Sequence, residues 1–162
     1  MTNPSELLRR YFEAYNAHDA SALGRLVGDK ITLSRPGQSA SGRDALLGTS
    51  AVDWVDFPDC RLDVKHSGTD GNHVFAEATF RGNNTGSLHM PDGTVAPPTG
   101  RPIALECGLF GDVEGGVLTA LRVYWDNALS MQQLGLLPGM TSPAGVEPTG
   151  THAHQALKTR TT

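Results

Sequence analysis

The sequence predicts an α+β fold, in which a curved antiparallel or mixed sheet and about three helices enclose a conical pocket. Apolar residues recur at helical spacing up to Phe57, whereas from Cys60 to Asp126 they alternate with polar residues. Helices followed by a run of strands are the element order of an α+β domain. A chain of 162 residues is long enough for one domain with a real core and a tail.

Three helices are predicted in the first third of the chain. The first begins with Asn3 as N-cap and Pro4 at the first helical position. Asp19 caps a second, short helix. Ser41–Asp44 has the pattern of a capping box and opens a third helix, which ends at Phe57. The apolar stripe of the first helix consists of Leu7, Leu8, Tyr11, Phe12 and Tyr15.

The remaining elements are predicted as strands and one final helix. A short strand over Lys30–Ser34 lies between the second and third helices, and the other strands follow the third helix. A Pro-rich excursion ending at Pro97-Pro98-Thr99-Gly100 separates two of these later strands. A short helix over Asn127–Leu134 closes the domain. The later strands are predicted over residues 60–66, 73–81, 101–110 and 117–126.

The composition argues against several classes of partner. A net charge of -4 without a basic patch argues against nucleic acid and anionic membranes, and no apolar stretch reaches the roughly 18 residues of a membrane span. The N-terminus lacks the pattern of a signal peptide. Cys60 and Cys107 are expected to be buried free thiols in a reducing compartment. We therefore predict a cytoplasmic protein.

The end of the chain differs in composition from the rest. Beyond Pro138-Gly139 the residues are mostly Thr, Pro, Gly, Ala and His, with almost no large apolar side chain. Such a segment offers little surface to bury. We expect one domain over residues 1–140 and a disordered tail over residues 141–162.

Asp126 is the leading candidate for a catalytic residue. It ends an apolar strand, and strict alternation places it on one strand face with Leu118, Arg122 and Tyr124. A carboxylate that projects into an apolar cavity loses solvation and becomes a usable general base. The alternative is that Asp126 is simply the N-cap of the helix that follows it.

Four segments together resemble the SnoaL-like polyketide cyclases, within the superfamily of nuclear transport factor 2, ketosteroid isomerase and limonene epoxide hydrolase. The resemblance covers roughly residues 5–138, and its most specific part is the closing Tyr124-Trp125-Asp126-Asn127 with Gln133–Pro138. The other three segments are Tyr11–Asp19, Gly42–Leu46 and Pro98–Ile103.

The resemblance implies a cofactor-independent enzyme that closes a ring by aldol chemistry on a polycyclic or polyketide carbonyl compound. In that family the carboxylate at the end of the last strand acts as acid and base, which here is Asp126. Family members often carry histidines where this chain has Ser34 and Asn84. Asn84 and Tyr124 are therefore the first candidates to donate a hydrogen bond to the developing oxyanion. No metal-ligand spacing, phosphate loop or flavin signature is present, so no cofactor is expected.

Other side chains are candidates for the pocket wall. His66 shares a strand face with Leu62, and the alternative is a histidine at the rim. Tyr15 and Trp54, with Tyr11 and Phe57, are expected to wall the cavity, although plain core packing explains each equally well. Glu77 and Glu106 are either a second carboxylate in the cavity or solvated outward-facing residues.

The sequence leaves two alternative functions open, and it also predicts an oligomer. The same fold also suits a non-catalytic module that binds a small molecule or another protein. An epoxide hydrolase is a weaker interpretation, because it needs an Arg flanked by two Asp residues, and Arg122 has no such partners at the expected spacing. We predict a homodimer or homotetramer through the outer sheet face, with Val117, Leu121, Val123 and Trp125 in the interface.

Overall fold

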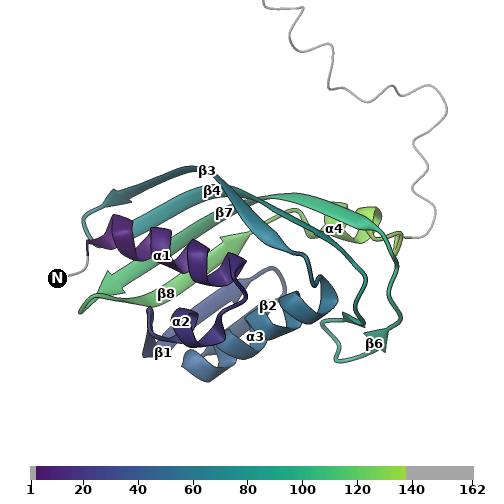
Figure 1. Cartoon of the computed structure of the whole chain (residues 1–162), viewed down its shortest axis with the longest axis horizontal. Coiled ribbons are helices and arrows are strands. Elements are labelled where there is room, and N and C mark those ends of the chain that lie inside the picture. The colour runs from purple at the N-terminus through teal and green to yellow at the C-terminus, as the bar shows by residue number, and fades with distance from the viewer. Residues whose placement is uncertain (1–2, 138–162) are drawn as a thin grey trace, which may run out of the picture.

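A six-stranded mixed sheet forms the body of the protein (Figure 1), as the computed structural model shows for residues 3–137. The predicted tail over residues 141–162 and the domain boundary at residue 140 lie outside the described residues. The strands are β1 (Val27–Arg35), β2 (Gln38–Ser41), β3 (Arg61–Asp70), β4 (His73–Asn83), β7 (Pro102–Glu114) and β8 (Val117–Tyr124). Their order across the sheet is β2-β1-β8-β7-β4-β3. Only β1 and β8 pair in parallel; the other neighbours are antiparallel.

Three helices cover one face of this sheet, and a fourth closes its end. Figure 1 shows α1 (Pro4–Asn16), α2 (Ala20–Gly24) and α3 (Arg43–Asp56) on the same side of the strands. The short helix α4 (Asn127–Gln133) follows β8, and β5 (Leu88–His89) pairs with β6 (Val95–Ala96) in a separate small hairpin. The predicted α+β architecture is confirmed. No helix within residues 3–137 is long and apolar enough to cross a membrane.

The first two helices start as their sequences predict. The Asn3 side chain accepts a hydrogen bond from Ser5 N at 3.0 Å, and the Asp19 side chain accepts one from Ala22 N at 2.8 Å. The capping box predicted for α3 is wrong. Ser41 pairs with Thr32 in the β1–β2 hairpin, so Gly42 takes the N-cap position with a φ of 99° and no capping side chain.

The core lies between α1 and the inner face of the sheet. The buried side of α1 meets β3 and β4, where Leu62, Ala76 and Ala78 are buried. Each large apolar side chain buried in this way contributes roughly 1.5–3 kcal/mol. Cys60 and Cys107 are both buried and free, as predicted. The buried residues of α1 are Leu7, Leu8, Tyr11, Phe12, Ala14 and Tyr15.

A bulge in β8 decides which of its side chains face the helices. Asp112 pairs with Ala120 and Val113 with Leu118, so Thr119 is an extra residue. The alternation therefore shifts by one place, and Leu118 and Leu121 are both buried. Beyond the bulge the inner face carries Leu121, Val123 and Trp125, which line a cavity. The prediction of these three as an outward set was wrong, as was the inward placement of Arg122, Tyr124 and Asp126.

Candidate functional site

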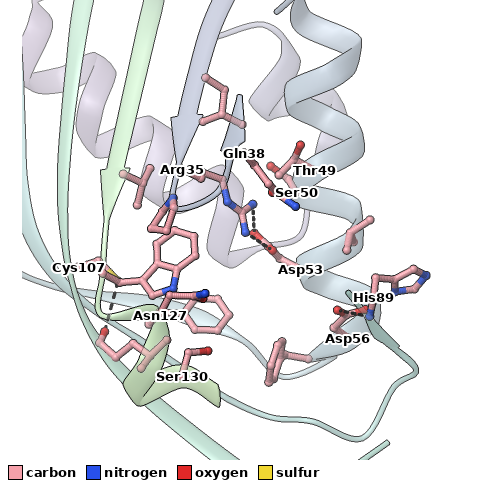
Figure 2. A pocket seen from close by; sticks show the side chains of 18 of the residues that line it. Arg35, Gln38, Thr49, Ser50, Asp53, Asp56, His89, Cys107, Asn127 and Ser130 are labelled. Atoms are coloured by element: carbon pink, nitrogen blue, oxygen red, sulfur yellow. Dashed lines mark hydrogen bonds and ion pairs between the residues drawn. The ribbon is translucent and has the colours of Figure 1, made fainter. Parts of the chain in front are cut away.

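A cavity of about 620 Å³ lies between the helices and the inner face of the sheet. Its wall is mostly apolar and comes from α1, α3 and α4, from all six strands of the sheet and from the segment around β5. This volume is within the range of pockets that hold small organic molecules. Figure 2 shows that the polar groups of the wall are few and are gathered at separate places.

The first polar group is a cluster of Arg35, Asp53 and Tyr15. Arg35 ends β1, just before the turn at Pro36-Gly37, and its two terminal nitrogens donate to the two carboxylate oxygens of Asp53 at 3.0 and 3.2 Å. The Tyr15 hydroxyl donates to Asp53 Oδ2 at 3.0 Å. A strand, α3 and α1 thus each supply one member, and Figure 2 places the ion pair well inside the cavity.

Partial burial sets the charges of this cluster. The side chains of Arg35 and Asp53 are only 18% and 21% exposed. Burial lowers the pKa of Arg35, but the adjacent Asp53 carboxylate raises it by more, so the guanidinium stays charged. Burial, reinforced by the negative charge of Asp53, raises the pKa of Tyr15 well above its usual value and keeps its hydroxyl a proton donor. The Arg35 guanidinium also lies 5.2 Å from the ring centre of Trp125.

The second polar group is formed by Asp56 and His89, one helical turn beyond Asp53. Asp56 is buried; its Oδ1 lies 2.5 Å from His89 Nδ1, and its Oδ2 accepts from the His89 backbone N at 2.9 Å. Because a carboxylate oxygen only accepts, this geometry requires a proton on His89 Nδ1. In Figure 2 the His89 ring lies at the rim, away from Arg35 and Asp53.

Asn84 connects the end of α3 to the loops around residues 86 and 99 through hydrogen bonds. Its amide nitrogen donates to the backbone oxygens of Asp56 and Gly86, at 2.9 and 3.2 Å, and its oxygen accepts from Thr99 N at 2.7 Å. Asn84 is fully buried and does not line the cavity. The expectation that it donates to a substrate oxyanion is therefore wrong, because backbone groups already occupy its amide.

The third polar group comes from α4, on the opposite wall. Figure 2 shows Asn127 and Ser130 pointing into the cavity from the side that faces Arg35 and Asp53. Asp126 precedes them as the N-cap of α4, and its Oδ1 accepts from Leu129 N at 3.0 Å. Asp126 is exposed and is not part of the cavity wall. The expectation that it enters a pocket was wrong, and the N-cap alternative describes its position.

The other predicted wall residues are dispersed. Tyr15 lies on the cavity wall, as do Tyr11 and Phe57. Trp54 instead stacks on His18 between α1 and α3, with ring centres 5.1 Å apart. The predictions that Trp54, His66 and Tyr124 face the cavity were wrong.

Two local features explain the displaced residues. In β3, Lys65 is an extra residue, so His66 pairs with Glu77 and is exposed. Tyr124 is 55% exposed on the outer face, where the bulge in β8 turns it. Glu77 and Glu106 are exposed, and Glu106 pairs with Lys65, in agreement with the outward alternative.

Sequence reasoning missed Arg35, Asp53, Asp56 and His89. A signal was present in α3, which buries Ser50 and Asp56 while it exposes Val52 and Val55. A helix whose polar residues face inward, against its hydrophobic pattern, indicates a site. No set of three His, Cys, Asp or Glu side chains in residues 3–137 gathers closely enough to hold a metal ion.

Comparison with known proteins identifies the family. The model of the SnoaL-like domain matches residues 8–121. The chain belongs to the SnoaL-like domain family. Among proteins with curated descriptions, none matches.

Solved structures share the SnoaL-like fold at low sequence identity. A candidate SnoaL-like polyketide cyclase from Jannaschia sp. CCS1 has a TM-score of 0.73 at 19% identity, over 83% of this chain and 93% of that one. IdmH, a candidate polyketide cyclase from Streptomyces antibioticus, has a TM-score of 0.67 at 24% identity, over 82% and 99%. A protein of ketosteroid isomerase-like fold from Catenulispora acidiphila, bound to trimethylamine, has a TM-score of 0.67 at 21% identity, over 91% and 100%.

Proposed function

We propose that this SnoaL-like protein is a cofactor-independent enzyme of the polyketide cyclase type. It closes a ring by intramolecular aldol chemistry on a hydrophobic polycyclic or polyketide carbonyl compound. The observation that carries the proposal is a carboxylate, Asp53, held inside an apolar cavity by Arg35 and Tyr15. The names of the structural neighbours support the same class of reaction.

The base of the proposed reaction is Asp53 in place of Asp126. The Asp53 carboxylate takes a proton from the carbon next to a substrate carbonyl, and the electron pair of that C–H bond forms the enolate. The enolate carbon then attacks a second carbonyl carbon of the same molecule, a C–C bond forms, and the carbonyl π electrons move to oxygen. The protonated Asp53 returns the proton to this alkoxide, so atoms and charge balance.

Arg35 and Tyr15 have supporting roles. The charged guanidinium stabilises negative charge that develops on an enolate oxygen. The neutral Tyr15 hydroxyl can turn from Asp53 to the same oxygen, since burial keeps it protonated. The apolar wall excludes water, which strengthens both interactions.

A substrate-independent probe tests the base. 5-Nitro-1,2-benzisoxazole loses a carbon-bound proton to a carboxylate that is free to act as a base in an apolar pocket, and ring opening gives a coloured phenolate. We expect the protein to catalyse this elimination and Asp53→Asn to lose at least about a hundredfold in kcat, the usual minimum share of a general base. KM should change little, because the amide retains the size of the carboxylate.

Asp126→Asn is the matched control. Asparagine caps a helix about as well as aspartate, so this variant keeps α4 intact while it removes the carboxylate predicted from sequence. Its turnover should equal that of the unmodified protein. Loss of turnover in Asp126→Asn with full activity in Asp53→Asn would reverse the two assignments.

A non-catalytic binding module is the second candidate. One observation favours it: Arg35 and Tyr15 already donate hydrogen bonds to both carboxylate oxygens of Asp53, which leaves this carboxylate less available as a base. In that case the unmodified protein and Asp53→Asn would bind the probe and show equally slow elimination. An epoxide hydrolase is less well supported, because within residues 3–137 Arg35 has one carboxylate partner, not two.

A further inference from the structure

The α4 wall of the cavity carries two polar side chains that the proposed proton transfer does not use. Asn127 and Ser130 are three residues apart, so they lie on one face of the helix. Both line the cavity, and Figure 2 shows them on the side formed by α4. Within residues 3–137 neither side chain has a hydrogen-bond partner, in contrast to every polar group of the opposite wall described above.

The helix that carries these two side chains is held at both ends. Asp126 caps its first turn. At its last turn, the Gln133 side chain accepts from Ala104 N at 2.8 Å and donates to Ala104 O at 3.0 Å, as a neighbouring strand would. Leu134 is buried against the core. The backbone that carries Asn127 and Ser130 is thus fixed relative to the sheet, which lowers the entropic cost of binding.

A polyketide or polycyclic carbonyl compound carries several oxygens. The two carbonyls that react are next to each other, near Asp53 and Arg35. An oxygen at the other end of the molecule lies away from this cluster, and in an apolar cavity it needs a hydrogen-bond donor of its own. An amide N–H and a hydroxyl on the far wall supply such donors without adding charge to an apolar cavity.

We propose that Asn127 and Ser130 bind a second oxygen of the substrate, one at the end that lies away from Asp53, and so select molecules with oxygen functions at both ends. This inference rests on the proposed function for the class of substrate. Recognition itself is a matter of binding and is measurable without turnover. The α3 wall holds the first oxygen and the α4 wall holds the second.

Two ligands of nearly equal shape test the proposal. 6-Acetyl-2-naphthol carries a carbonyl at the end opposite its hydroxyl, and 6-isopropyl-2-naphthol has a methyl group in place of that carbonyl oxygen. Isothermal titration calorimetry should show the acetyl compound binding about fivefold more tightly, the worth of one net hydrogen bond. In Ser130→Ala and Asn127→Asp, which remove a donor with little change of size, the ratio should fall towards one.

Gln132→Ala is the matched control, because Gln132 is on the same helix but not in the cavity wall. Its affinity ratio should remain about fivefold, the worth of one net hydrogen bond. Equal affinities in the unmodified protein, or a ratio that survives both cavity variants, would overturn the proposal. If the ratio behaves as expected while Asp53→Asn leaves elimination unchanged, the two-ended binding site stands and the ring-closing function fails.

Discussion

Two carboxylates on α3 differ in what surrounds them, and their surroundings separate their roles. Asp53 contacts Arg35 and Tyr15 inside the cavity, whereas Asp56 is buried against His89 at its rim. They are one helical turn apart, so both side chains leave the helix on nearly the same side. Asp53 lies beside open apolar space, where a substrate can reach it, and is suited to catalysis. Asp56 accepts hydrogen bonds from the ring and the backbone N–H of His89, so its role is to hold the segment around β5 in place.

At the same scale, the buried tyrosines predict how stability changes at high pH. Burial raises the pKa of Tyr11 and of Tyr15 above their ordinary value near 10. Folding therefore favours the neutral phenols. Their contribution is fully present below about pH 10 and is lost as the pH rises above the unfolded-state value.

Urea unfolding measured between pH 8 and pH 11 checks this expectation. The unfolding midpoint should decline above about pH 10, with a shallower decline in Tyr15→Phe, since the reference pKa of tyrosine is near that pH. Phenolic absorbance should show Tyr11 and Tyr15 titrating only as the protein unfolds. Ionisation of both in the folded protein near the ordinary value would contradict the expectation.

At the scale of elements, the segment around β5 depends on close contact with the end of α3. A Cβ atom added to Gly86 would lie 1.7 Å from the backbone oxygen of Val55, so no side chain fits there without a backbone shift. Gly86→Ala should destabilise the protein by about 1–3 kcal/mol, the cost of overpacking. It should also speed hydrogen exchange of residues 86–96, because the Asp56–His89 contact would open.

A glycine-to-alanine substitution within α3 provides the control. Gly48 is inside the helix, and an added Cβ would meet nothing within 4 Å. Gly48→Ala should therefore stabilise the protein by roughly 0.5–1 kcal/mol through helix propensity. Thermal or urea unfolding of both variants should show a lower free energy of unfolding for Gly86→Ala and a higher one for Gly48→Ala. Equal effects would show that the Gly86 contact is not required.

Local sequence signals predict most elements but not their irregularities. Caps, turn residues and periodicity place α1, α2, β4 and β7 within a few residues, because these signals act over one or two turns. The β2 strand was missed because its four residues carry no apolar alternation. The bulge at Thr119 was missed because it is fixed by pairing with β7 and β1, which the strand itself does not encode.

At the scale of the whole molecule, the site could not be predicted for a related reason. Tyr15, Arg35 and Asp53 come from three elements that are far apart in the sequence and meet only in the folded chain. No local sequence pattern marks any of the three as a site residue. Only long-range packing brings them together in one cavity. The family was recognisable from sequence because its signals are local and spread along the chain.

We still expect two copies of the chain to associate through the outer face of the sheet, but through other residues than the sequence predicted. Phe75, Phe110 and Tyr124 are exposed on β4, β7 and β8, and the rings of Phe110 and Tyr124 pack edge to face with centres 5.9 Å apart. Gly68 on β3 leaves room for the Phe75 ring. This aromatic set crosses the sheet opposite the helices. A self-complementary contact between two copies would bury it.

We expect a homodimer, or a homotetramer built from it, at micromolar concentration by light scattering. Phe110→Ser removes the centre of the aromatic set and should shift the molar mass towards that of a monomer, since truncating a central aromatic anchor commonly costs 2 kcal/mol or more of binding. Val55→Ser is the control, because Val55 is also exposed but lies on α3, away from this face. Its mass should match that of the unmodified protein. A monomeric unmodified protein would show that the aromatic face serves another purpose, and Asp53 and the cavity would then act within a single chain.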